Sequence, residues 1–219
     1  MRISHKHHFI FLSNPRCGST SIRKILDRYS DIESDDRGPY YHHISAPNLR
    51  KQFIEMGWVW EDYYSFTTIR NPWARMLSAY KFGQQNQTSV WHRIGEEAGS
   101  FQAFIHHPDT FSDKRGLKSI DRFAFDEDGI PLLNDIIPLE QLDKILPALL
   151  EQIGIKESNI PMINTTLPLF KRIRSVLLPD STHAQNINPA AYRQYYGAEE
   201  RDIVARVFAA DIEMGKYQF

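Results

Sequence analysis

The chain has 219 residues, of which 42% are hydrophobic and 24% charged, and 26 basic against 27 acidic residues leave a net charge of −1. This composition is typical of a globular protein and argues against disorder of the whole chain. The near-neutral balance argues against a general binder of nucleic acid or membrane surfaces, and the single cysteine, Cys17, excludes an intramolecular disulfide.

The first predicted elements are a buried strand and a helix. Residues 7–12 end in the apolar run FIFL, which Ser13-Asn14-Pro15 terminates, and this pattern is typical of a strand buried on both faces. Over residues 19–29 the apolar side chains recur at intervals of three and four, as on one face of a helix. Residues 31–39 are polar and rich in turn formers, which predicts a loop.

A second helix and a second strand–helix pair follow. Ser45 is a suitable N-cap for the second helix, and Gly57 a suitable end. Residues 63–69 (YYSFTTI) are aromatic and β-branched, which favours a strand, and residues 73–82 then predict a helix. Residues 83–122 are less regular, with one short helix expected around 101–106.

The remaining predictions complete an α/β pattern. In chain order they are strands at 123–125 and 135–139, a helix over 140–153 that Pro147 is expected to kink or interrupt, a loop over 159–189 that contains the basic run 171–174, and helices over 189–196 and 199–214. Strands that alternate with helices predict one domain over residues 1–219, with a mostly parallel sheet flanked by helices in three layers. Ligands of such sheets bind at the carboxyl ends of the strands.

The turn after the first strand has the features of a phosphate site. Backbone N–H groups at a helix N-terminus attract anions, and Gly18 allows the backbone to approach a phosphate closely. Three hydroxyl residues at 19–21 add donors, and Arg16 adds a permanent positive charge. A tight strand–helix turn capped by a hydroxyl is the structural alternative, but the combination favours anion binding.

This turn does not match the loop of nucleoside-triphosphate enzymes. The pattern G-x-x-x-x-G-K-[ST] is absent, and Ser19 stands where the lysine belongs. The second strand is followed by Arg70 rather than by an aspartate that would hold Mg²⁺. Metal-dependent phosphoryl transfer is therefore disfavoured. Arg70 and Ser78 offer a second clamp for a phosphate. Taken alone, Arg70 would be interpreted as an ion-pair partner and Ser78 as a helix-surface hydroxyl.

Together the two motifs, PRCGSTS and IRNPWARMLSAYKF, resemble the nucleotide-binding motifs of the sulfotransferases, in particular the branch with carbohydrate sulfotransferases and their bacterial relatives. The resemblance implies an α/β fold related to nucleotide kinases and 3′-phosphoadenosine 5′-phosphosulfate (PAPS) as the donor. It assigns Arg70 and Ser78 to the 3′-phosphate. The residues that it assigns to the 5′-phosphosulfate are Arg16, Cys17, Gly18, Ser19, Thr20 and Ser21. The family commonly has lysine where Arg16 stands.

Sulfonate transfer also requires a base for the acceptor hydroxyl. Histidine is the usual choice, and His42-His43 lie just before a predicted helix start, between the two phosphate motifs. In the family that the motifs resemble, the base precedes such a helix start, which selects His43 and leaves His42 as the alternative. The resemblance therefore implies in-line transfer with His43 and Arg16 as catalytic residues and no metal.

Several expectations concern partners and location. The acceptor is a small molecule or a glycan, with sugars, lipid head groups, peptides and metabolites all open, and the oligomeric state is open as well. The apolar runs are too short for a membrane span, so we expect a soluble cytoplasmic protein that binds no nucleic acid. The alternatives are a nucleotide or small-molecule kinase of related fold and a non-catalytic nucleotide-binding relative.

Overall fold

The computed structural model describes residues 1–34, 41–112, 116–156 and 191–219. The chain forms two compact units. Unit 1 comprises Met1–Ile69 and Ala124–His183, and unit 2 comprises Arg70–Phe123 and Ala184–Phe219. Each unit is built around a hydrophobic core of its own. The predicted loop over 159–189, with its basic run, lies outside the described residues.

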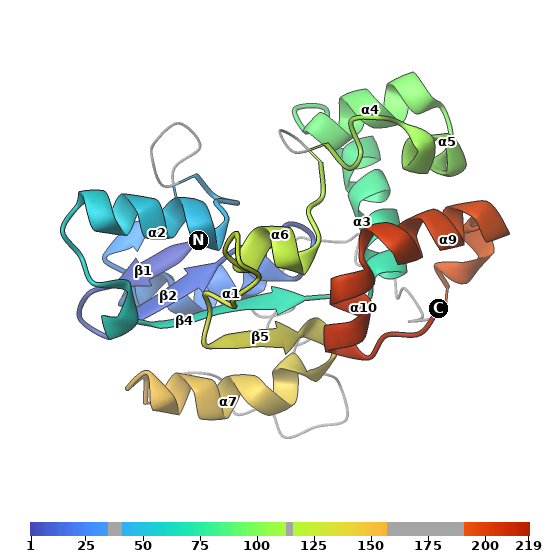
Figure 1. Ribbon diagram of the computed structural model, residues 1–219. Helices are drawn as coiled ribbons and strands as arrows, with labels where there is room; N and C mark the ends of the chain where they lie inside the picture. The colour runs from blue at the N-terminus through green and yellow to red at the C-terminus, as the bar shows by residue number, and fades with distance from the viewer. Residues whose placement is uncertain (35–40, 113–115, 157–190) are drawn as a thin grey trace. The chain divides into compact units, whose positions relative to one another are not determined.

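Unit 1 contains a five-stranded sheet in the order β3-β1-β2-β4-β5 (Figure 1). Its strands are β1 (Arg2–Ser4), β2 (Phe9–Leu12), β3 (Ile32–Glu33), β4 (Tyr64–Ile69) and β5 (Asp135–Pro138). The predicted α/β class is confirmed, with a parallel core of β2, β4 and β5. The sheet is mixed because β1 pairs antiparallel with β2 and β3. The short connection from β1 to β2 forms a hairpin, since a parallel crossover needs a dozen residues or more.

Helices cover both faces of this sheet. They are α1 (Ser19–Leu26), α2 (Ala46–Glu55) and α7 (Leu142–Gln152), with 3₁₀ turns at Asp27–Tyr29, Trp60–Asp62 and Leu139–Gln141. The apolar sides of α1 and α7 pack with Phe9, Phe11 and Phe66 of the strands in one core. Figure 1 shows α2 and α7 on opposite sides of the sheet, so the strands are buried between helices, as the continuous apolar run of β2 predicts.

Unit 2 is helical. Its elements are α3 (Pro72–Gln85), α4 (Val90–Ala98), α5 (Phe101–His106), α6 (Ile120–Ala124, which ends at the unit boundary), a 3₁₀ turn at Arg193–Tyr195, α9 (Ala198–Val207) and α10 (Ala209–Gly215). Its core contains a fully buried ion pair between Arg75 and Asp211. Arg75 Nη1 also donates to the Lys118 carbonyl at 3.0 Å, and Asp211 Oδ2 accepts the Ile120 N–H at 2.7 Å.

Three short elements of the structure were not predicted from the sequence. β1 was not predicted, and β3 lies within the stretch expected to be a loop, because strands of three and two residues are too short to show a period. α4 was also missed, although Ser89 caps it by accepting the Trp91 N–H and Gly99 ends it with a left-handed φ of 74°.

Two further predictions are corrected in the second half of the chain. The strand expected at 123–125 is wrong: α6 continues to Ala124, and Phe125 forms only an isolated bridge with Pro131. The helix expected over 189–196 is reduced to the 3₁₀ turn Arg193–Tyr195 in its described part. Pro147 is accommodated inside α7 without ending it.

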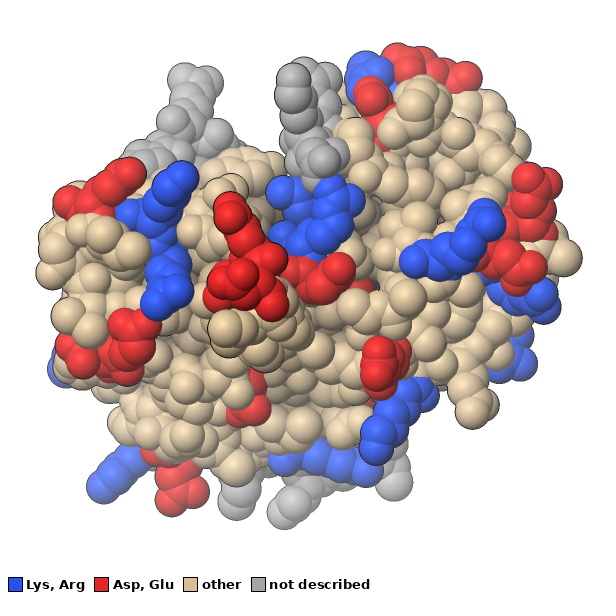
Figure 2. All heavy atoms as spheres, in the orientation of Figure 1, with Lys and Arg blue, Asp and Glu red and all other residues tan. Residues whose placement is uncertain are grey.

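The surface carries no strong charge pattern on the face that Figure 2 shows. Basic and acidic side chains are interspersed there, in keeping with a net charge of −1. None of the helices in the described parts of the chain combines the length and the apolar character that crossing a membrane requires.

Candidate active site

The turn between β2 and α1 has a strained backbone. Arg16 has a φ of 63° and Gly18 a φ of 80°, both in the left-handed region. Gly18 adopts it freely, whereas an L-residue such as Arg16 pays about 1–2 kcal/mol. A residue keeps such a conformation only where its surroundings enforce it, and strained positions of this kind cluster at functional sites.

The enforcing contacts come from the neighbouring parallel strand, β4. The side-chain amide of Asn14 donates to the Thr68 carbonyl at 3.1 Å, and the Thr68 hydroxyl donates to the Cys17 carbonyl at 2.7 Å. Thr67 similarly donates to the Leu12 carbonyl at 2.7 Å. Both threonines are fully buried. The carboxyl end of β4 therefore holds the shape of the turn that follows β2.

The helix that follows the turn begins without a side-chain cap. Gly18 is the N-cap residue of α1, and the first turn contains no acidic side chain. Within the described part of the chain, neither a side-chain cap nor an acidic residue of the first turn offsets the positive end of the helix dipole, which favours an anion there.

The predicted donor residues occupy different environments around this turn. Arg16, Gly18 and Ser21 are half-buried, Ser19 is buried and Thr20 is exposed. The Cys17 side chain is buried with its Sγ 3.5 Å from the Pro15 carbonyl, and the Cys17 N–H donates to the Asn14 carbonyl at 3.3 Å. The hydrogen bonds of Cys17 therefore shape the turn.

The second motif begins at Ile69, the last residue of β4, and continues into unit 2. Arg70 is half-buried, and Ser78 lies in α3 with 9% of its surface exposed. Asn71 caps α3 by accepting the Ala74 N–H at 3.2 Å, and Pro72 occupies the first turn. The sequence NP after Arg70 thus ends the strand and starts the helix that carries Ser78.

The two candidate bases lie just before α2, and different partners hold them. His43 Nδ1 is 2.7 Å from the Ser13 carbonyl, which only accepts hydrogen bonds, so His43 carries its proton on Nδ1. His42 Nε2 lies 3.2 Å from Nη1 of Arg23, which only donates. The His43 ring therefore keeps a basic nitrogen, Nε2, whereas the corresponding nitrogen of His42 accepts a hydrogen bond from Arg23.

Both rings are held in the neutral form. Burial lowers the pKa of His43 to about 3, with a further contribution from His42. Burial also lowers the pKa of His42 to about 4, assisted by the amino group of Met1 and by Arg23 and Arg2. A general base must be unprotonated to act, and at neutral pH both histidines meet that condition.

Several residues of this site could not be recognised from the sequence. Ser13, Asn14, Arg23 and Thr68 shape it through contacts between residues distant along the chain. In the sequence, the two threonines of β4 indicate only a preference for strand structure. Ser13 Oγ is also fully buried and makes no hydrogen bond within the described parts of the chain.

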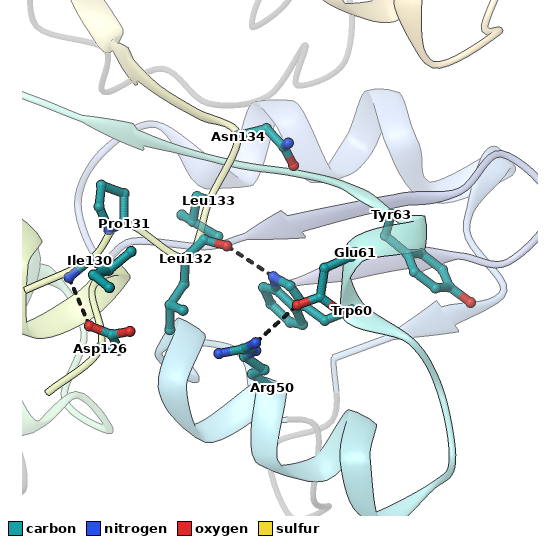
Figure 3. A pocket seen from close by; sticks show the side chains of 10 residues that line it. All are labelled: Arg50, Trp60, Glu61, Tyr63, Asp126, Ile130, Pro131, Leu132, Leu133 and Asn134. Atoms are coloured by element: carbon teal, nitrogen blue, oxygen red, sulfur yellow. Dashed lines mark hydrogen bonds and ion pairs between the residues drawn. The ribbon is translucent and has the colours of Figure 1, made fainter. Parts of the chain in front are cut away.

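A pocket of about 430 Å³ lies elsewhere in unit 1 (Figure 3). Its lining residues are Arg50, Trp60, Glu61, Tyr63, Asp126, Ile130, Pro131, Leu132, Leu133 and Asn134. Arg50 pairs with Glu61 at 2.9 Å, and Trp60 Nε1 donates to the Leu132 carbonyl at 2.9 Å. None of the predicted site residues lines this pocket.

One group of side chains in unit 2 has the composition of a metal site. The ligand atoms of His106, Glu199 and Glu200 lie within 4.8 Å of one another. Glu200 already uses both carboxylate oxygens, toward His106 Nε2 at 3.1 Å and the Gly197 N–H at 3.0 Å. These contacts tie the start of α9 to α5, which explains the cluster without a metal ion.

Comparison with known proteins identifies the family. The model of the sulfotransferase family matches residues 1–123, which is more than half of the chain and includes both motifs. A solved structure of mouse sulfotransferase SULT7A1 complexed with PAP is 15% identical, with a TM-score of 0.43 over 96% of this chain and 85% of that one. No curated protein matches significantly. On the family match, the chain belongs to the sulfotransferase family, and its identification as a sulfotransferase enzyme is confirmed.

Proposed function

We propose that this enzyme transfers the sulfonate group of PAPS to an acceptor hydroxyl by direct in-line displacement. The observation that carries the proposal is that the candidate base and the start of α1 meet at one turn. The uncapped start of α1 offers an anion site, and His43 is hydrogen-bonded to Ser13 at the beginning of the same turn. A donor and a base that are held at one turn are suited to a reaction in which positioning dominates.

The proposed donor contacts follow the two motifs. Arg16, the N–H groups of residues 18–20 and the hydroxyls of residues 19–21 bind the 5′-phosphosulfate. Arg70 and Ser78 bind the 3′-phosphate. The buried side chain of Cys17 leaves that residue its backbone role in the turn. On this proposal the whole chain acts as a single sulfotransferase domain.

His43 is the proposed base because of its hydrogen-bonded state. Its Nδ1–H is committed to the Ser13 carbonyl, which leaves Nε2 to take the proton of the acceptor hydroxyl. The acceptor oxygen then forms a bond to sulfur while the bond between sulfur and the 5′-phosphate oxygen breaks. Arg16 and the N–H groups of α1 stabilise the charge on the departing phosphate. Arg16 stays protonated throughout, so it acts as an electrostatic stabiliser and not as a proton donor.

The proposal also covers the acceptor, the absence of a metal from the reaction, and the cellular compartment. We propose a carbohydrate or another small hydroxyl compound as the acceptor, after the branch that the motifs resemble. No metal takes part in the proposed displacement, because the cationic groups of the donor site provide the charge stabilisation. The single cysteine suits a reducing compartment, and we propose the cytoplasm.

The assignment of Arg70 predicts a selective change in nucleotide binding. In Arg70→Met, affinity for adenosine 3′,5′-bisphosphate should fall by about 10- to 100-fold, because hydrogen bonds to charged groups contribute about 1.5–3 kcal/mol. Affinity for adenosine 5′-monophosphate, which lacks the 3′-phosphate, should stay unchanged. Ser78→Ala should show the same selectivity with a smaller loss. Titration calorimetry measures both nucleotides.

The control for this prediction is Arg201→Met. Arg201 lies in the same unit and is exposed, and it pairs with the adjacent Asp202. This variant should bind both nucleotides as the wild type does. Equal weakening of the two nucleotides by Arg70→Met, or no weakening of either, would contradict the assignment of Arg70 to the 3′-phosphate.

A further inference from the structure

The segment that carries the two histidines is attached to residues on either side of the donor motif. His43 is bound to the Ser13 carbonyl at the end of β2, and His42 is bound to Arg23 in α1. All four residues belong to unit 1. Arg23 lies in the helix whose first residues form the proposed donor site, so the same helix contacts both the donor and the histidine segment.

The contact between Arg23 and His42 requires a neutral imidazole. A guanidinium has five N–H donors and no acceptor, so Nε2 of His42 must present a lone pair to it. Protonation of His42 would place two cations 3.2 Å apart and remove the hydrogen bond. Arg23 thereby orients the His42 ring and adds to the effect of burial, which keeps that ring neutral.

The His42 ring contacts the ring of the proposed base, His43. The ring centroids of His42 and His43 lie 4.8 Å apart with an interplanar angle of 80°, an edge-to-face contact. Tyr41 contacts both rings at longer range, with centroids 6.0 Å from His43 and 6.2 Å from His42, but its side chain is half exposed. His42 is therefore the closer and better-held neighbour of the His43 ring.

We propose that Arg23 is a positioning residue, which acts on the base His43 through its hydrogen bond to His42. The chain of contacts runs from the Arg23 guanidinium to His42 Nε2, and from the His42 ring to the His43 ring. The Ser13 carbonyl fixes His43 on its Nδ1 side. This inference rests on the proposed function of His43 as the base. It adds a residue that neither phosphate motif includes.

Removal of Arg23 should change transfer without changing donor binding. In Arg23→Met, kcat should fall by about 10- to 100-fold, since small displacements of a catalytic group have effects of that size. The affinity for adenosine 3′,5′-bisphosphate should remain that of the wild type. Arg23→Gln keeps a neutral N–H donor for His42 and should recover much of the lost kcat. Arg28→Met, which changes an exposed arginine of the same unit, is the matched control.

A double-mutant cycle separates this role from a merely structural one. His42→Phe keeps an aromatic ring against His43 but removes the nitrogen that Arg23 contacts. If Arg23 acts through His42, Arg23→Met should have little further effect on kcat in the His42→Phe background. Additive losses in the cycle would show that Arg23 acts by another route and would overturn the proposal.

The state of the rings gives a readout that needs no acceptor. In ¹⁵N-histidine-labelled protein, His42 should titrate at higher pH in Arg23→Met than in the wild type, because a nearby cation is lost while burial remains. The other cations near the two rings, Arg2 and the amino group of Met1, are unchanged by the substitution. Unaltered His42 and His43 signals in a folded Arg23→Met protein would overturn the proposal.

Failure of this inference and failure of the proposed function give different results. Activity is measured with PAPS and a panel of N-acetylglucosamine, 4-nitrophenol and a serine-containing peptide. If the wild type binds adenosine 3′,5′-bisphosphate and consumes PAPS, but Arg23→Met matches it in kcat and in the ring signals, only the positioning role is wrong. If the wild type neither binds the bisphosphate nor consumes PAPS, the proposed function is wrong, and the positioning role falls with it.

Discussion

Replacement of His43 by alanine is expected to lower kcat for sulfonate transfer by about 100- to 10,000-fold, the usual contribution of a general base. The variant loses the nitrogen that accepts the acceptor proton, while the uncapped start of α1 and the contacts between β4 and the turn do not involve the His43 side chain. Binding of adenosine 3′,5′-bisphosphate should therefore persist. Steady-state turnover of PAPS and a bisphosphate titration provide the two measurements.

The pH dependence of the wild type gives an independent check on this base. With a pKa of about 3, His43 stays unprotonated well below the ordinary histidine pKa of about 6.5. The decline of kcat/KM at acidic pH should accordingly lie below that ordinary value.

The control for His43→Ala is His7→Ala, which changes a histidine that contacts Tyr29 and should keep wild-type turnover. Unchanged turnover in His43→Ala would remove His43 from the mechanism.

The second large effect concerns the stability of unit 2. Asp211→Ala should lower the free energy of unfolding by about 3–5 kcal/mol, because it leaves the Arg75 guanidinium buried without its carboxylate. Both side chains are fully buried, and the substitution also removes the acceptor of the Ile120 N–H. Urea denaturation measures the loss as a lower midpoint.

Two further variants test whether the large loss of stability in Asp211→Ala arises because the ion pair is buried. Asp202→Ala breaks the exposed pair with Arg201 and should cost less than about 1 kcal/mol. The double variant Arg75→Met/Asp211→Leu removes both charges together and should be more stable than Asp211→Ala alone, since no buried charge is left unpaired. A loss in Asp211→Ala no larger than that in Asp202→Ala would contradict this account of the unit 2 core.

Sequence patterns predicted those parts of the fold in which the local signal is long. The apolar run of β2, the β-branched β4 and the helical periodicity of α1 and α7 all exceed the few residues that a pattern requires. β1 and β3 are too short for that, and their pairing depends on partners elsewhere in the chain. The strand expected around Phe125 failed because three apolar residues fit the end of a helix equally well.

The candidate site likewise has parts that the sequence predicts and parts that it does not. The donor residues proposed around Gly18 and at Arg70 and Ser78 could be predicted from the sequence, because each group lies within one short segment. The hydrogen bond from His43 to Ser13 spans 30 positions, and that from Arg23 to His42 spans 19. Nothing in the sequence near Arg23 indicates a partner so far away, so its contact with His42 can be recognised only in the tertiary structure.

The donor nucleotide is the central claim, and a thermal unfolding titration of the wild type tests it most directly. A ligand at about 100 times its Kd stabilises the folded state by about 2.7 kcal/mol, which for a chain of this size raises Tm by roughly 5–10 °C. We predict such a rise with adenosine 3′,5′-bisphosphate and none with ATP and Mg²⁺. A rise with ATP and Mg²⁺ but none with the bisphosphate would contradict the proposed function.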